Sequence, residues 1–140
     1  MPRILVIDES PSVRNQLSQL LMLNKYDVQT ADNGIEGLKR LVDGYATRDF
    51  DAVLIDMTMT TVSSLELTWR YKKFEMVQCR HESSRACGPP RNVPVIFMSS
   101  IPLNGVSQRN AVDSGVDAFL QIPFTTAQLR AVLDNVVIQL

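Results

Sequence analysis

Carboxylates and hydroxyls stand at the ends of short apolar runs, where side chains can do chemistry. Asp8 and Glu9 follow one such run, Asp56 ends a second, and Ser99 ends a third. If these runs are neighbouring parallel strands, the carboxylates converge at one edge of a sheet. Their mutual repulsion disfavours that cluster unless a hard divalent cation lies among them. Oxygen ligands with no histidine or thiol nearby favour Mg²⁺ over zinc.

The same residues suggest a reaction. A metal-held carboxylate that faces a hydroxyl and backbone N–H donors is suited to accept a phosphoryl group and form an acyl phosphate. Each residue also has a plainer interpretation when it is taken alone. Asp56 could be a helix N-cap, and Ser99 with Ser100 could simply end a strand.

The elements that must position these residues follow from hydrophobic periodicity. We expect strands over 3–7, 26–31, 51–56, 93–98 and 116–121. We expect helices from Pro11 to about Leu21 and over about 34–42, 63–77, 106–112 and 125–139. The second of these carries its apolar stripe on Ile35, Leu38, Leu41 and Val42. Strands and helices in strict alternation predict right-handed crossovers and a parallel sheet with helices on both faces.

The composition excludes several classes of protein. The 140 residues are 45% hydrophobic and 21% charged, as in an ordinary soluble domain. The net charge of −1 gives no reason to expect a nucleic-acid partner. No apolar run is long enough to cross a membrane, so we expect no membrane association. The two cysteines are too few for a disulfide scaffold, which favours a reducing cytoplasm as the compartment.

Residues 78–91 interrupt the alternation and are interpreted as an inserted surface loop. They contain the breaker Gly88-Pro89-Pro90 and three potential zinc ligands, Cys79, His81 and Cys87. The spacing of these ligands fits no standard zinc site, so free thiols and a solvated histidine are favoured.

Charge is uneven along the chain. Residues 70–91 hold six basic and two acidic residues, a net charge of +4, which leaves −5 for the remainder. A solvated basic segment is the favoured interpretation, and a docking patch for an acidic partner is the alternative.

Taken in order, the motifs resemble those of the response-regulator receiver domains of two-component signalling. ILVIDESPSVR resembles the family's first strand, acidic pair and first helix, and LIDMTM its phosphoacceptor segment, with Met59 as the motif's methionine. VPVIFMSS resembles the fourth strand and GVDAFLQIPF the fifth-strand motif. The resemblance covers essentially the whole chain. It implies one CheY-like, flavodoxin-like α/β receiver domain over residues 1–140, with a doubly wound five-stranded sheet of order 2-1-3-4-5.

The resemblance also implies roles for the site residues. Asp56 would be the phosphoacceptor, and Glu9 and Asp56 would hold Mg²⁺ together with the backbone carbonyl of Thr58. Asp8 would act on the metal through water. The donor would be a histidine kinase or a phosphotransfer protein.

The switch residues follow from the same motifs. Ser99 would be the switch hydroxyl and Phe119 the switch aromatic, and they would remodel a partner surface on the fourth helix, fifth strand and fifth helix. Ile122-Pro123 would be a cis peptide. The family has a lysine before that proline, so Ile122 leaves the site one positive charge short.

The missing charge leaves two hypotheses open. One is a receiver domain phosphorylated on Asp56, and the other is a pseudo-receiver that binds proteins independently of phosphate. Ile122 could also be a plain packing residue that fills the space of a lysine stem. We expect no output segment after the last helix, so the chain is either a single-domain regulator or a piece of a longer hybrid kinase.

Overall fold

The computed structural model describes residues 2–59, 62–81, 93–100, 109 and 113–137. The strands are β1 (Arg3–Ile7), β2 (Asp27–Ala31), β3 (Ala52–Asp56), β4 (Val95–Ser99) and β5 (Ala118–Gln121). The helices with assigned bounds are α1 (Pro11–Leu23), α2 (Gly34–Asp43), α3 (Ser64–His81) and α6 (Thr126–Val137).

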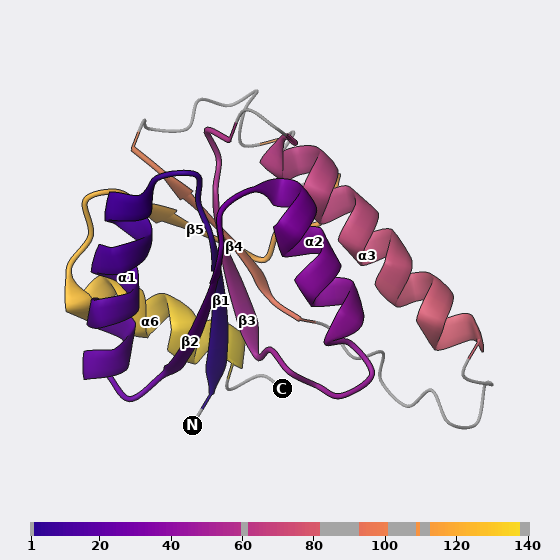
Figure 1. The fold of residues 1–140 in the computed structure, drawn as a ribbon, viewed down its shortest axis with the longest axis horizontal. Helices are drawn as coiled ribbons and strands as arrows, with labels where there is room; N and C mark the ends of the chain where they lie inside the picture. Colours follow the sequence, from indigo (N-terminus) through magenta and orange to yellow (C-terminus); the bar gives the residue numbers. More distant parts are fainter. Residues whose placement is uncertain (1, 60–61, 82–92, 101–108, 110–112, 138–140) are drawn as a thin grey trace.

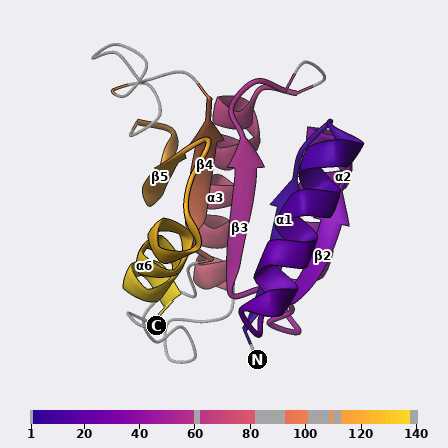
Figure 2. The same cartoon turned by 90° about the vertical axis from the view of Figure 1, so that its left-hand side faces the viewer.

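The strands form one parallel sheet with the order β2-β1-β3-β4-β5, which confirms the predicted topology. Helices α1 and α6 lie on one side of the sheet, and α2 and α3 lie on the other (Figure 1). The turned view agrees, with α1 and α6 in front of the strands and α3 behind them (Figure 2). The chain is therefore a doubly wound α/β domain.

Each face of the sheet has its own hydrophobic layer. On the α2–α3 side, Leu5 and Ile55 of the central strands pack with Leu67 of α3. On the α1–α6 side, Val6 and Leu54 pack with helix residues such as Leu17 and Leu129. Because both faces of β1 and β3 are covered, these strands are continuous apolar runs rather than alternating ones.

Two helices begin directly after strands, at the carboxyl edge of the sheet. The Ser10 hydroxyl accepts the N–H of Val13 at 3.4 Å and caps α1, with Pro11 at the first helical position. The Asn33 side chain accepts the N–H of Glu36 at 2.8 Å and caps α2. These caps turn the chain sharply after β1 and β2, so that residues 8–10 stay at that edge.

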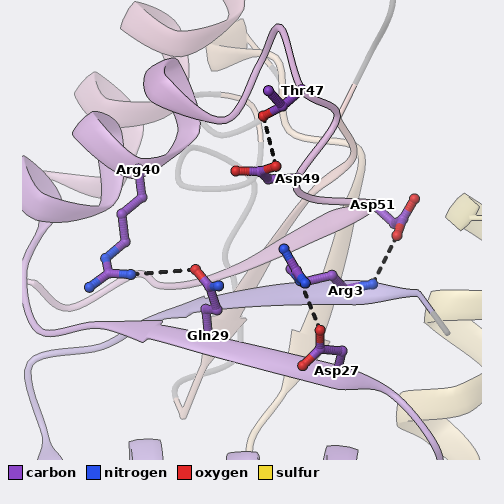
Figure 3. A network of polar contacts seen from close by, with 7 residues as sticks. All are labelled: Arg3, Asp27, Gln29, Arg40, Thr47, Asp49 and Asp51. Carbon is purple, nitrogen blue, oxygen red and sulfur yellow. Dashed lines mark hydrogen bonds and ion pairs between the residues drawn. The ribbon is translucent and has the colours of Figure 1, made fainter.

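The amino edge of the sheet is held by polar contacts around Arg3 (Figure 3). The Arg3 backbone N–H donates to Asp51 at 2.8 Å, just before β3, and its guanidinium pairs with Asp27 of β2 at 2.9 Å. Figure 3 also shows Arg40 of α2 near Gln29 of β2. The Arg3–Asp27 pair is partly exposed, so it contributes at most about 1 kcal/mol and serves mainly to align strand ends.

The structure corrects two predictions. Residues 78–81, expected in the inserted loop, are the last turn of α3, while 82–91 lie outside the described residues. The segment lacks periodicity, but it has no helix breaker before Gly88, so the helix can continue. Ile35, expected on the apolar stripe of α2, is 63% exposed. Most of the helix expected over 106–112 lies outside the described residues.

No helix within the described ranges combines the length and the apolar character that crossing a membrane requires.

Gly37 marks a close approach of α2 to β1. A Cβ atom at this position would overlap Cδ1 of Ile7 and lie 2.8 Å from its Cγ1, and Ile7 is fully buried. We expect Gly37→Ala to lower the free energy of unfolding by about 1–3 kcal/mol, because overpacking outweighs the gain in helix propensity. Urea unfolding would measure this, with Lys39→Ala on the exposed face of α2 as the control. A more stable Gly37→Ala variant would contradict the close packing.

Candidate functional site

The carboxyl edge of the sheet brings Asp8 level with Asp56. Ile7 of β1 is the register partner of Ile55 of β3, so the next residue of each strand lies at the same height. Asp56 in turn is the partner of Met98 in β4, one residue before Ser99. The sequence predicted this gathering from strand ends alone.

Asp8 directly follows β1 and is buried, with 3% of its surface exposed. One carboxylate oxygen accepts the backbone N–H of Ser10 at 2.8 Å. Its backbone carbonyl accepts a hydrogen bond from the Arg14 guanidinium at 2.6 Å. Asp8 is therefore fixed from both sides by the first turn of α1.

Burial raises the pKa of Asp8 above its ordinary value, and the charges of Asp56 and Glu9 raise it further. The hydrogen bond from Ser10 and the charge of Arg14 act in the opposite direction. Asp8 is thus close enough to Asp56 and Glu9 for their charges to repel its own. Such repulsion is the condition that a bound cation relieves.

The raised pKa of Asp8 predicts a pH dependence of stability. The folded chain binds this proton more tightly than the unfolded chain, so stability falls as pH rises from about 3.8 through the folded pKa. We expect Asp8→Asn to be more stable than the parent at pH 7, and the difference to shrink towards pH 4. Urea unfolding at both pH values measures it, with Asp43→Asn on the exposed side of α2 as the control. If the parent were more stable than Asp8→Asn at pH 7, the predicted cost of the buried Asp8 charge would be wrong.

Asp56 ends β3 and is only partly buried. One carboxylate oxygen accepts the backbone N–H of Thr58 at 3.0 Å, and the Thr58 hydroxyl lies 2.9 and 3.0 Å from the two oxygens. The N–H of Met57 donates to the Met98 carbonyl at 3.0 Å, which ties the turn to β4. The turn therefore presents Asp56 towards solvent with its carboxylate oriented.

The donor set fits a hard divalent cation. Asp8, Glu9 and Asp56 supply oxygen only, and their mutual repulsion favours a positive ion among them. In the part of the chain that the structure describes, however, no three acidic, histidine or cysteine side chains are arranged to hold a metal ion.

Ser99 is the last residue of β4 and is 8% exposed. Its carbonyl accepts the N–H of Ile122 at 2.7 Å, and its register partner in β5 is Gln121. Ser99 therefore lies at the same sheet edge as Asp56, one residue further along its strand. Its role as a switch hydroxyl stays a prediction.

Phe119 lies in β5 opposite Phe97 of β4. The two rings meet edge to face, with centroids 6.3 Å apart. Phe119 is partly buried against the core on the α2–α3 side.

Ile122 follows β5, and the Ile122-Pro123 bond is cis, as expected. Its side chain is partly buried against the hydrophobic layer on the α1–α6 side. The interpretation of Ile122 as a packing residue therefore has direct support. It supplies neither a charge nor a side-chain hydrogen bond to the carboxylates.

Arg14 was missed by sequence reasoning. It brings a guanidinium to the back of the acidic cluster, where its charge lowers the pKa of Asp8. A signal existed in the sequence, because a basic residue in the first turns of a helix lies close to the strand end that precedes it. Only the direction of the side chain, towards the Asp8 carbonyl, could not be inferred.

A doubly wound parallel sheet with an acidic cluster at its carboxyl edge defines a flavodoxin-like α/β domain. The chain matches the family model of the response regulator receiver domain over residues 4–134. Response regulator MprA of Mycobacterium sp. (strain KMS) is 32% identical over 130 residues, which cover 92% of this chain and 47% of that protein. The chain belongs to the response-regulator receiver domain family of two-component systems. It spans about half the length of the curated relatives that it matches.

Solved structures agree on the fold. Chemotaxis protein CheY4 of Vibrio cholerae has a TM-score of 0.75 at 22% identity and covers 97% of this chain and 98% of its own. A CheY-like receiver domain protein from Methanospirillum hungatei JF-1 has a TM-score of 0.78 at 17% identity, with coverages of 99% and 95%. At these identities the likeness establishes the fold alone.

Proposed function

We propose that this receiver domain accepts a phosphoryl group on Asp56 from the phosphohistidine of a histidine kinase or a phosphotransfer protein. An Asp56 oxygen attacks phosphorus as the N–P bond breaks, and the released imidazole takes up a proton. The observation that carries the proposal is the position of Asp56, level with buried Asp8 and oriented by Thr58. An acyl phosphate formed there is an intermediate that can be hydrolysed by water.

Glu9 and Asp56 are the residues proposed to hold Mg²⁺, together with the backbone carbonyl of Thr58, while Asp8 acts through water. Bound there, the ion would neutralise charge on the transferring phosphoryl group. Residues of the chain itself position the two aspartates. Ser10 and Arg14 fix Asp8, and the turn after β3 aims Asp56 outwards.

Readout is proposed to pass through Ser99 and Phe119. The Ser99 hydroxyl would move towards the phosphoryl oxygens, and Phe119 would turn inwards on its partly buried side. That movement would change the surface around β5 and α6, where a downstream protein is expected to bind. The proximity of Ser99 to the end of β5, through the Ile122 N–H, supports this coupling.

The test is phosphoryl transfer to the purified chain from acetyl phosphate with Mg²⁺, followed by intact mass. We expect one added phosphoryl group in the parent and none in Asp56→Asn, because the amide cannot form the acyl phosphate. Asp43→Asn, an exposed change on α2, is the matched control and should be modified like the parent. Modification that persists in Asp56→Asn would overturn the assignment of the acceptor.

The second candidate function is a pseudo-receiver that binds a protein partner without phosphate control. The apolar packing of Ile122 favours it, because the site lacks a cation at that position. No mass shift with a kinase donor, in a chain shown separately to bind Mg²⁺, would favour this candidate over the first.

A further inference from the structure

Helix α3 carries two apolar stripes, and the fold buries only one of them. The inner stripe, with Leu67 and Tyr71 fully buried, packs against the sheet. The outer stripe consists of Trp69, Met76 and Val77, which are 52%, 60% and 39% exposed. Spacings of seven and eight residues place the latter two on the same side of the helix as Trp69. The outer stripe is therefore an apolar surface that this fold leaves in solvent.

Basic side chains border that stripe. The Lys73 ammonium lies 4.8 Å from the centroid of the Trp69 ring, in a cation–π contact. The outer α3 face is defined here by Trp69, Arg70, Lys73, Met76 and Val77. An exposed apolar patch with a charged rim is typical of a protein interaction site, and tryptophan is enriched among the residues that dominate binding.

The exposed charges beside the outer stripe leave an excess of one positive charge, that of Lys73. The side chains of Lys72 and Glu75 turn inwards, and the Lys72 ammonium lies near the carboxylates of Glu75 and Asp117. On the outer side, Glu66 pairs with Arg70 at 2.8 Å. Within the described ranges Lys73 contacts the Trp69 ring and forms no ion pair with an acidic side chain.

We propose that the outer α3 face binds an amphipathic, acidic segment of a partner protein. Its apolar side chains would cover Trp69 and Met76, and its carboxylates would meet Arg70 and Lys73. A second copy docked face to face would set these basic residues against each other. A nucleic acid would leave the apolar stripe uncovered. The face lies across the sheet from α6 (Figure 1).

Trp69 is the sole tryptophan of the chain and reports on this face directly. The probe is a synthetic 16-residue helix-forming peptide with leucine and phenylalanine on one face and glutamate on the other. There are two control peptides. The first has the same composition in scrambled order, and the second has lysine in place of each glutamate. Trp69 emission and the anisotropy of a fluorescein-labelled peptide are measured with the whole 140-residue chain.

We expect saturable binding of the acidic amphipathic peptide, with Trp69 emission moving to shorter wavelength as the ring leaves water. Lys73→Glu and Met76→Ala should each weaken binding at least fivefold. Leu23→Ala, at an 81% exposed position at the end of α1, should stay within twofold of the parent. Melting curves of each variant confirm that it is folded.

Four results would overturn the proposal. These are equal binding of the scrambled or lysine peptide, unchanged binding by the folded Lys73→Glu variant, and no saturable binding of the acidic peptide. The fourth is self-association in sedimentation that Lys73→Glu abolishes, which would assign the face to a second copy.

Discussion

Glu75→Ala is expected to lower the free energy of unfolding by about 3 kcal/mol, because it leaves the buried Val93 N–H without an acceptor and removes one of the two carboxylates around Lys72. Glu75 is 5% exposed and lies on the inner side of α3. Its carboxylate accepts the backbone N–H of Val93 at 2.9 Å and lies 3.6 Å from the Lys72 ammonium. Burial raises the pKa of Glu75, although Lys72, the Val93 N–H and the Tyr71 hydroxyl all oppose the shift.

Lys72 extends this network to the amino ends of two strands. Its ammonium donates to the Val93 carbonyl at 2.9 Å and lies 3.2 Å from the carboxylate of Asp117. Asp117, just before β5, accepts the N–H of Val95 at 2.8 Å. Removing Glu75 therefore leaves both the Lys72 ammonium and the Val93 N–H without this acceptor, in a place that water reaches poorly.

Urea unfolding at pH 7 measures the effect, and two variants serve as controls. Glu66→Ala makes the same change on the same helix, but at an exposed pair with Arg70, so we expect a loss of at most about 0.5 kcal/mol. Glu75→Gln keeps an acceptor for Val93 and should lose less than Glu75→Ala. A Glu75→Ala variant no less stable than Glu66→Ala would show that the network contributes nothing.

The fold and the position of the site could be predicted because both depend on the order of apolar and polar residues along the chain. The runs that became β1 and β3 are apolar on both faces, which is typical of central parallel strands. Asp8 and Asp56 directly follow or end those runs, and parallel strands bring their carboxyl ends to one edge. The cis bond at Ile122-Pro123 was anticipated from the motif and is present.

What could not be predicted concerns the direction in which charged side chains turn. Residues 70–91 were counted as one solvated basic segment, yet Lys72 and Glu75 lie inwards and bond to strand ends. Periodicity assigns a charged residue to the surface by default, and only tertiary contacts reverse that assignment. The same limit hid Arg14, whose guanidinium folds back onto the Asp8 carbonyl.

The second large effect is expected at the position without a cation. If Asp56 is the acceptor, Ile122→Lys should raise the rate of phosphoryl gain from acetyl phosphate by about 10- to 100-fold, since one well-placed donor contributes about 10²–10³ to such a reaction. Position 122 is anchored at the carboxyl edge by its N–H bond to Ser99. It is separated from Asp56 by two strand spacings, about 10 Å. The flexible stem of lysine can follow the apolar surface under Ile122 while its ammonium reaches the polar edge.

Ile122→Met separates the charge from the change in shape, because methionine is unbranched and apolar. Both variants lose part of the Ile122 packing, so we expect each to be about 1 kcal/mol less stable than the parent, and only the lysine variant to react faster. Intact-mass time courses with Mg²⁺ measure the rates, and Asp56→Asn in the lysine background should abolish the gain. Equal rates for the lysine and methionine variants would mean that the missing charge does not limit this site. Ile122 would then be compatible with phosphorylation, and it would no longer support the interpretation of the chain as a pseudo-receiver.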